Sequence, residues 1–524
     1  MNGLKAMLAL IPALSVLAVS AGKIEHRYVY LRFDYTADEH LALTSNLVAT
    51  AKAHGYTDVM FSSTVGLGEI FQWDERRLER LKAAKRLCDE TGLGIAVGMW
   101  SIGYAKEALF KVDPNLAAAQ PVFDTVYRVK NGACAHMAEP ARELISKPME
   151  VHAPARENDV GERLLAVKPH RSYRLKIVAS SSSGEHETWP ILVTVRRKAA
   201  KSDYVEHRVF KLKTDGEKRT FLVNFPSMAE NELRIRCAGY NRRYTGSATI
   251  HSMELSETEP QPVIRRHGTP ITVRNRRTGA VLSEGTDYAP IPKAKGVWPG
   301  AWVKDKFRVK PLAGGAIKEG DEITVDCYAS FPVWGRWVSA CMAAEELPSI
   351  IERSAAKVAE ILKPKVWLLS FDEVRSGGGC EDCRREGDMA HVYAGLCVKA
   401  MRIVRRHCPD AEFYLWNDLV DPFAQPDEGL STQLYSSLKG VWDLLPKDLG
   451  IAYWTYQWKE DGLKFFARQG RNILIGAYYD ERELKRSLEW MELARTMPGV
   501  TGIMYCTWRN KWELLGEFGD EAAK

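Results

Sequence analysis

The sequence has few cysteines and little excess of charge, and each shortage excludes a class of protein. Ten cysteines are scattered among 524 residues, which is too few for a scaffold built on disulfides. The 73 basic and 67 acidic residues leave a net charge of only +6, with no basic stripe or arginine-rich tail. Nucleic acid is therefore not an expected partner.

Long apolar runs are also scarce. The longest lies within residues 1–21 and is shorter than the roughly 20 residues that a membrane-spanning helix needs. Lys5 precedes it, residues 6–18 are mostly apolar, and Val19-Ser20-Ala21 forms a small-residue cleavage site. These features predict a signal peptide, and thus a secreted or periplasmic protein with no membrane association.

Two common site signatures are missing as well. No histidine stands at the end of a predicted strand, which argues against a histidine-based metal site or a Ser-His triad. The run Gly377-Gly378-Gly379 is not followed by the Lys-Ser/Thr of a phosphate-binding loop. The sequence therefore predicts no cofactor and no metal.

Strand and helix patterns alternate at the two ends of the predicted mature chain. Three predicted strands fall within residues 22–105 and five within residues 336–524. Eight β/α units predict an α/β fold, a (β/α)8 TIM barrel interrupted after its third strand. The predicted strands are 28–35, 58–63, 94–100, 365–373, 412–418, 451–458, 472–481 and 501–508.

Residues 106–335 break this alternation. They are rich in Thr, Val, Arg, Ser and Pro and contain short alternating runs such as "SYRLKIVASS" and "PILVTVRRK". The turn residues between these runs predict an inserted antiparallel β-sandwich over about residues 146–258. A smaller β-rich piece is expected to follow over about residues 263–330.

The residues at the predicted strand ends are the candidates for function, because barrel enzymes carry their active sites at the carboxyl ends of the strands. They are mostly carboxylates, tryptophans and tyrosines. Carboxylates supply the acid and the nucleophile of glycoside hydrolysis, and aromatic faces stack on sugar rings. The pattern predicts an exported glycoside hydrolase with an oligosaccharide or glycan substrate. Its candidate residues are Arg32, Asp34, Trp100, Asp372, Glu373, Trp416, Asp418, Trp454, Tyr478, Tyr479, Glu481 and Trp508.

The adjacent carboxylates Asp372 and Glu373 carry a family resemblance. A "DE" pair at the end of the fourth barrel strand resembles the catalytic pair of family 20 β-N-acetylhexosaminidases and related substrate-assisted glycosidases, over the barrel half only. The resemblance implies that Glu373 is the general acid/base and that Asp372 orients a 2-acetamido group whose oxygen is the nucleophile. It also implies an acetamido donor at Tyr478 or Tyr479, a wall of Trp416, Trp454 and Trp508, and sugar hydroxyls bound by Arg32.

Three other functions remain open at this stage. A retaining glycosidase for another sugar could use Glu373 as acid/base and Glu481 as nucleophile, which requires carboxyl groups about 5–5.5 Å apart. A non-catalytic carbohydrate-binding protein could be built on the same scaffold. A divalent-metal enzyme could use Asp372, Asp418 and Glu481, and chelator sensitivity would favour it. The sequence gives neither the sugar nor the linkage.

The pair Cys380 and Cys383 follows the glycine run beside the predicted site. It could form a local disulfide in an exported protein, or it could remain as two free thiols. A zinc site would need two further ligands, and Cys397 and Cys408 do not form a second CxxC. No metal is therefore predicted at this pair.

Overall fold

The computed structural model of the protein describes residues 23–64, 66–107, 109–152, 162–182, 186–197, 204–240, 244–260, 262–295, 307–424 and 433–524. The predicted signal peptide, residues 1–21, lies outside the described residues, so export remains a prediction. Within the described ranges, no helix combines the length and the apolar character needed to cross a membrane.

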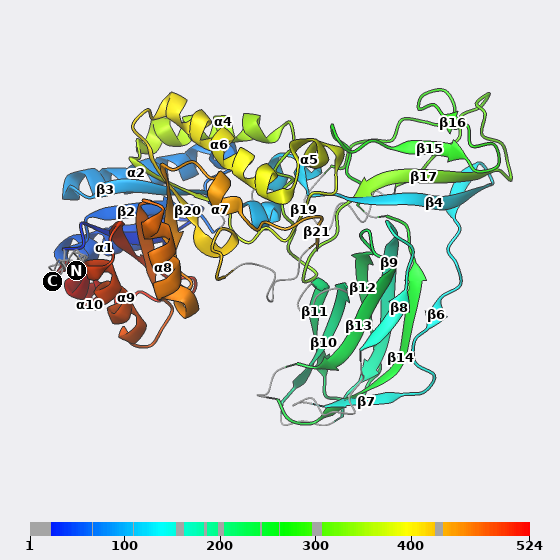
Figure 1. The fold of residues 1–524 in the computed structure, drawn as a ribbon, viewed down its shortest axis with the longest axis horizontal. Coiled ribbons are helices and arrows are strands. Elements are labelled where there is room, and N and C mark those ends of the chain that lie inside the picture. Colours follow the sequence, from blue (N-terminus) through cyan, green and yellow to red (C-terminus); the bar gives the residue numbers. More distant parts are fainter. Residues whose placement is uncertain are drawn as a thin grey trace, which may run out of the picture.

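Eight parallel strands close into a barrel at one end of the molecule (Figure 1). The last strand pairs with the first, Tyr28 lying opposite Met504. The strands are almost wholly buried, as expected of parallel strands covered on both faces. In order of pairing they are β1 (His26–Arg32), β2 (Asp58–Ser62), β3 (Gly94–Trp100), β18 (Val366–Ser370), β20 (Glu412–Trp416), β22 (Leu449–Tyr453), β23 (Ile473–Tyr479) and β24 (Val500–Cys506).

The helices are uneven in length. The longest is α6, which Asp388 begins by accepting a hydrogen bond from the backbone N–H of His391. The described α-helices are α1 (Asp38–Ala53), α2 (Glu75–Thr91), α3 (Leu109–Val112), α4 (Leu347–Leu362), α5 (Glu381–Glu386), α6 (Met389–His407), α7 (Val441–Leu444), α8 (Lys459–Arg468), α9 (Lys485–Thr496) and α10 (Leu515–Ala523).

Three antiparallel sheets lie outside the barrel. Two of them face each other as a β-sandwich around a separate apolar core that includes Trp189 and Phe225. The third sheet has the order β16-β15-β17-β4-β5. The strands of the sandwich are β6 (Arg142–Glu143), β7 (Met149–His152), β8 (Arg163–Ala166), β9 (Ser172–Ser180), β10 (Thr188–Arg197), β11 (Tyr204–Lys213), β12 (Arg219–Pro226), β13 (Glu232–Gly239) and β14 (Ser247–Glu257). Those of the third sheet are β4 (Gln120–Lys130), β5 (Ala133–His136), β15 (Thr272–Asn275), β16 (Val281–Leu282) and β17 (Glu322–Ala329).

The predicted fold class, an α/β (β/α)8 TIM barrel with one inserted sandwich, is wrong as a description of this chain. More of the described residues lie in strands than in helices. Three antiparallel sheets of four, five and five strands lie outside the parallel barrel. The described residues also lack a regular ring of one helix after each strand. The four-residue α7 follows β20, and the sheets of the insertion follow β3.

The irregular helical layer has local causes. Pro422 and Gly440 interrupt the stretch after β20, and neither residue suits a helix interior.

The third sheet depends on a long-range pairing. Strand β4, which precedes the sandwich in sequence, pairs with β17, which follows it. Such a long-range pairing leaves no periodic trace in the sequence, since periodicity reports only local structure.

The chain leaves the barrel and returns to it along neighbouring paths. The backbone N–H of Ala340 donates to the carbonyl of Ile102 at 2.9 Å, and that of Cys341 donates to the carbonyl of Leu116 at 2.7 Å. The returning segment includes a turn in which Val333 pairs with Trp337. This turn brings Arg336 and Trp337 to the mouth of the barrel.

Candidate active site

A cavity of about 660 Å³ lies at the carboxyl ends of the barrel strands. Its walls combine carboxylates, aromatic rings and two arginines, contributed by the barrel strands and by the segment that returns from the insertion. The described residues that line it are Tyr30, Arg32, Thr64, Gly66, Ser101, Tyr104, Arg336, Trp337, Ser370, Asp372, Glu373, Trp416, Asp418, Trp454, Tyr479 and Trp508.

The backbone that presents the "DE" pair is strained. Ser370, Phe371 and Glu373 have φ values of 66°, 50° and 49°, in the left-handed region that costs a residue other than glycine about 1–2 kcal/mol. The surrounding structure holds them there, since the N–H of Phe371 donates to the carbonyl of Trp100 at 3.0 Å and the hydroxyl of Tyr393 donates to the carbonyl of Phe371 at 3.0 Å. Strain of this kind gathers where a structure imposes a functional geometry.

Three carboxyl groups converge below this turn. The Oδ2 atom of Asp418 accepts a hydrogen bond from the backbone N–H of Glu373 at 2.8 Å. Burial, together with the negative charges of Asp372 and Glu373, raises the pKa of Asp418 to about 8. Burial also raises the pKa of Asp372. The cluster therefore keeps at least one proton near neutral pH, as a site for proton transfer requires.

A buried arginine holds the third carboxylate. The guanidinium of Arg375, which is 2% exposed, forms an ion pair with Glu373 through Nη2 and Oε2. It also donates to the backbone carbonyl of Glu373 at 3.1 Å and lies 4.4 Å from the ring of Trp334. These contacts fix the direction of the Glu373 side chain, which is 25% exposed.

Aromatic rings form a second part of the cavity wall. Trp454 and Tyr479 are stacked with their planes 9° apart, and Trp416 packs at an angle on Trp508 with ring centroids 6.4 Å apart. The Nε1 atom of Trp508 is buried and has no hydrogen-bond partner in the part of the chain that the structure describes. Flat apolar faces beside a free N–H donor suit a sugar ring with its hydroxyls.

Arg32 completes this wall. Its guanidinium lies 4.4 Å from the centre of the Trp508 ring, and its Nη2 donates to the carbonyl of Thr64 at 2.6 Å. The neighbouring Asp34 does not line the described cavity. Instead its carboxylate accepts hydrogen bonds from the N–H and the hydroxyl of Thr64 at 3.2 and 2.9 Å. Asp34 therefore holds Thr64, which is itself a residue of the cavity wall.

Three further residues predicted from the strand ends lie away from the described cavity wall. Trp100 is buried and donates through Nε1 to the hydroxyl of Ser354 at 2.9 Å. Tyr478 stacks on Tyr505 with ring centroids 4.1 Å apart. The Glu481 carboxylate pairs with Arg486 at 3.1 Å. The structure does bring Arg32, Asp372, Glu373, Trp416, Asp418, Trp454, Tyr479 and Trp508 together around one cavity.

Sequence reasoning missed several residues at the site. Tyr30 points into the barrel from the middle of β1. Alternate residues of a strand point to the same face, so the alternation along β1 could have identified Tyr30 as a residue of the interior. Arg336 and Trp337 lie just after the insertion, in the segment that returns to the barrel, where no strand or helix pattern applies. Arg375 lies two positions beyond Glu373, and only the folded loop turns it back onto that carboxylate.

No protein-family model matches the chain, and neither does any curated protein. Parts of solved structures resemble parts of it. The tandem GH20 modules of the pneumococcal exo-β-D-N-acetylglucosaminidase StrH match at 15% identity over 36% of this chain and 50% of that one, with a TM-score of 0.24. The GH20 β-N-acetylhexosaminidase of Streptomyces coelicolor A3(2) matches at 12% identity over 36% and 38%, with a TM-score of 0.24.

A carbohydrate-binding module gives a third partial match. The CBM22-1 xylan-binding domain of Paenibacillus barcinonensis Xyn10C is 8% identical over 27% of this chain and 99% of that one, with a TM-score of 0.16. The chain spans half or less of the two glycosidase structures. These likenesses are weak and partial.

Proposed function

We propose that this chain is a glycoside hydrolase whose cavity binds a sugar ring at the end of a glycan. The observation that carries the proposal is the convergence of Asp372, Glu373 and Asp418 with a tryptophan-rich wall in one cavity. A glycosidase needs a proton donor, a group that stabilises the oxocarbenium-like transition state and a surface that orients the ring. The carboxyl groups and aromatic rings of this cavity are of the chemical kinds that these roles need.

In this proposal Glu373 is the general acid/base and Asp372 orients the substrate. Glu373 lines the cavity and remains partly exposed, so it can reach a glycosidic oxygen. The Oδ1 atom of Asp372 is buried without a hydrogen-bond partner among the described residues, and it can accept the N–H of an acetamido group. Asp418 keeps a proton in the cluster, which limits the repulsion among three carboxylates.

The position of Glu481 favours assistance by the substrate over a carboxylate nucleophile. Glu481 lies outside the described lining of the cavity and is paired with Arg486. The alternative retaining mechanism needs this carboxylate about 5–5.5 Å from Glu373, on the other side of the bond. An acetamido oxygen of the substrate would supply the nucleophile without any further protein group.

Hydrolysis of a panel of aryl glycosides tests the proposal. We expect cleavage of N-acetylglucosaminides or N-acetylgalactosaminides, and a loss of roughly 10²–10⁴-fold in kcat/KM for both Glu373→Gln and Asp372→Asn. Glu481→Gln is the matched control and should retain activity. If Glu481→Gln loses as much as Glu373→Gln, or if only sugars without an acetamido group are cleaved, substrate assistance is ruled out.

The ion pair between Arg375 and Glu373 favours a second candidate, a non-catalytic carbohydrate-binding protein on the same scaffold. The guanidinium of Arg375 is paired with the Oε2 atom of Glu373, and this contact competes with the approach of a glycosidic oxygen to the same carboxyl group. Calorimetric binding of N-acetylglucosamine oligosaccharides, with no hydrolysis of any aryl glycoside in the panel, would support this candidate instead.

A further inference from the structure

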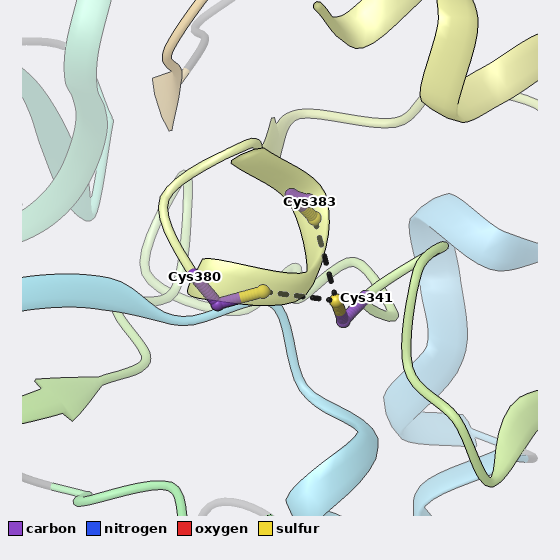
Figure 2. A group of neighbouring side chains, drawn as sticks. All are labelled: Cys341, Cys380 and Cys383. Carbon is purple, nitrogen blue, oxygen red and sulfur yellow. Dashed lines mark hydrogen bonds between the residues drawn. The ribbon is translucent and has the colours of Figure 1, made fainter. Parts of the chain in front are cut away.

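Three buried cysteines lie close together (Figure 2), and none of them is among the described residues that line the cavity. The Sγ atom of Cys341 lies 3.5 Å from that of Cys380 and 3.6 Å from that of Cys383. All three sulfur atoms lie within 4.8 Å of one another. The three residues are at most 2% exposed and are free thiols, not disulfides. The local disulfide considered for Cys380 and Cys383 is therefore absent from this structure.

The cluster joins segments that are far apart in the sequence. Cys380 and Cys383 stand at the start of α5, at the end of the loop that begins with Asp372 and Glu373. Cys341 belongs to the segment that returns from the insertion, and its backbone N–H is bonded to Leu116. Anything that bridges the three sulfur atoms would fasten the carboxylate loop to the returning chain.

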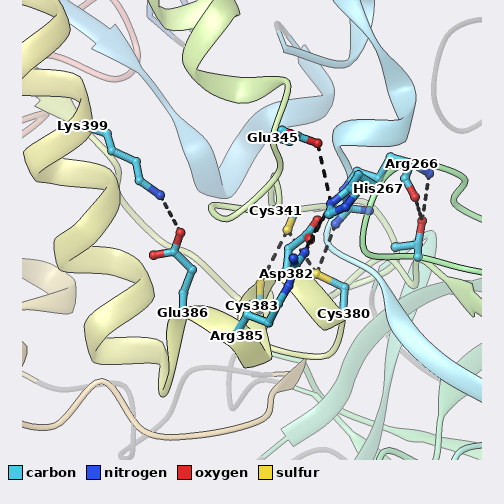
Figure 3. A network of polar contacts seen from close by, with 11 residues as sticks. Arg266, His267, Cys341, Glu345, Cys380, Asp382, Cys383, Arg385, Glu386 and Lys399 are labelled. Atoms are coloured by element: carbon cyan, nitrogen blue, oxygen red, sulfur yellow. Dashed lines mark hydrogen bonds and ion pairs between the residues drawn. The ribbon is translucent and has the colours of Figure 1, made fainter.

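A third segment places a positive charge against the sulfur atoms (Figure 3). Arg266 is 6% exposed and donates through Nη2 to the Sγ of Cys380 at 3.5 Å. Its Nε and Nη1 atoms are buried without hydrogen-bond partners among the residues that the structure describes. Buried guanidinium donors without partners cost folding free energy. Negative charge on the neighbouring sulfur atoms would stabilise this guanidinium.

We propose that Cys341, Cys380 and Cys383 bind a zinc ion as three thiolates, with the fourth position taken by water or another small exogenous ligand. Zinc–sulfur bonds of about 2.3 Å in a tetrahedral site place the sulfur atoms about 3.8 Å apart, close to the distances in this cluster. Binding releases the three thiol protons to solvent. The zinc and three thiolates carry one net negative charge, which the guanidinium of Arg266 balances.

Further contacts hold the segments around the cysteine cluster in place. The backbone N–H of Glu381 donates to the carbonyl of Gly268 at 2.9 Å. A Cβ at Gly268 would lie 2.2 Å from the Asp382 carboxylate, so only glycine allows this approach. The ring of His267 is hydrogen-bonded to Asp382 at 2.9 Å. These contacts lock the Arg266 segment against α5 and limit the movement of the cysteine side chains.

The third ligand explains why the sequence predicted no metal. A zinc site is recognised in a sequence from two closely spaced pairs of ligands, but Cys341 lies 39 positions before Cys380 as a single cysteine. The candidates considered as further ligands, Cys397 and Cys408, lie outside the cluster. Only the return of the insertion to the barrel brings Cys341 to the pair.

Metal analysis of the full chain, purified with a thiol reductant, tests the site. We expect about one zinc per chain in the wild type and a loss of roughly tenfold or more in Cys341→Ser and in Cys383→Ser, since each removes a ligand. Cys408→Ser is the matched control, because Cys408 is a half-buried thiol outside the cluster; it should keep its zinc. Equal zinc in all four proteins would refute the site.

Measurements on the wild type keep the proposal testable if the serine variants fail to fold. Metal-stripped, reduced protein titrated with Co²⁺ should develop sulfur-to-cobalt charge-transfer bands at one equivalent, and Zn²⁺ should then displace them. Arg266→Met should weaken the Zn²⁺ affinity by roughly tenfold or more, as the loss of a supporting group does at other metal sites. No binding at one equivalent, or a stable disulfide among the three cysteines under these reducing conditions, would overturn the proposal. This test is independent of glycosidase activity.

Discussion

At the scale of single residues, Asp418 shows how burial sets the protonation of the site. It lines the cavity, and its Oδ2 atom accepts the N–H of Glu373. Its Oδ1 atom has no partner among the described residues and is buried. Burial and two neighbouring carboxylates give it a pKa of about 8, against 3.8 for an ordinary aspartate. The folded protein therefore holds this proton more tightly than the unfolded chain does.

This difference predicts a pH-dependent effect of Asp418→Asn. Between about pH 4 and pH 8 the folded state binds more protons than the unfolded state, so the Asp418 carboxyl lowers stability increasingly as the pH rises. The asparagine keeps an acceptor for Glu373 and cannot ionise. We expect the variant to be more stable than the wild type by an amount that is largest at pH 8 and smallest at pH 4. Urea unfolding at pH 4, 6 and 8 measures it, and an unchanged difference across this range would contradict the assigned pKa.

At the scale of elements, the loop after β18 depends on a close approach by Gly103. The backbone N–H of Gly103 donates to the carbonyl of Asp372 at 3.2 Å. A Cβ at this position would lie 2.4 Å from the Asp372 carbonyl oxygen and 2.3 Å from that of Glu373. Both contacts are with backbone, which cannot rotate away. The glycine therefore allows the 3-10 turns after β3 to support the strained turn that carries both carboxylates.

Gly103→Ala should therefore displace the Asp372 and Glu373 backbone. We expect a loss of stability of about 1–3 kcal/mol from overpacking and, with it, a loss of the proposed glycosidase activity. Gly395→Ala is the control. Gly395 lies inside helix α6, and a Cβ there would meet only the flexible carboxylate of Glu386, at 3.5 Å. That variant should be neutral or more stable. Urea unfolding of both variants is the measurement; equal stability of the two would show that the loop adapts to the methyl group.

At the scale of the whole molecule, a short two-stranded sheet connects the sandwich to the loop that carries Asp372 and Glu373. Strands β19 (Ser376–Gly377) and β21 (Gln433–Leu434) pair between the barrel and the sandwich (Figure 1). The Gln433 side chain donates to the carbonyl of Val205 in the sandwich at 3.1 Å, and its backbone N–H donates to the carbonyl of Arg375 at 2.6 Å. Gln433 thus joins the sandwich to the residue that holds Glu373.

Replacing this side chain should loosen the junction without reshaping it. Gln433→Met keeps the volume of the fully buried side chain but removes the donor to Val205. We expect the free energy of unfolding to fall by about 1–3 kcal/mol, because the buried carbonyl of Val205 loses the Gln433 donor. Urea unfolding and the rate of proteolytic cleavage between the sandwich and the barrel report the change. Wild-type values for both would show that other contacts hold the two parts together.

The sequence by itself determined the local properties of this protein. Buried apolar runs indicated the eight barrel strands, because side-chain periodicity is a local property. The residues at the ends of those strands indicated half of the described residues that line the cavity, including Asp372, Glu373, Trp416 and Trp508. The carboxyl ends of parallel strands meet at one end of a closed barrel, so strand position alone was enough to bring these residues together.

Only the tertiary structure decided what depends on contacts between distant segments. It placed Trp100, Tyr478 and Glu481 away from the described cavity wall, and it brought in Arg375 and Trp337. It paired β4 with β17, although the whole sandwich lies between these two strands in the sequence. It also brought Cys341 close to Cys380 and Cys383. These arrangements arise from long-range packing, which has no period in the sequence, and the direction of a side chain beyond a strand end is set by the loop that surrounds it.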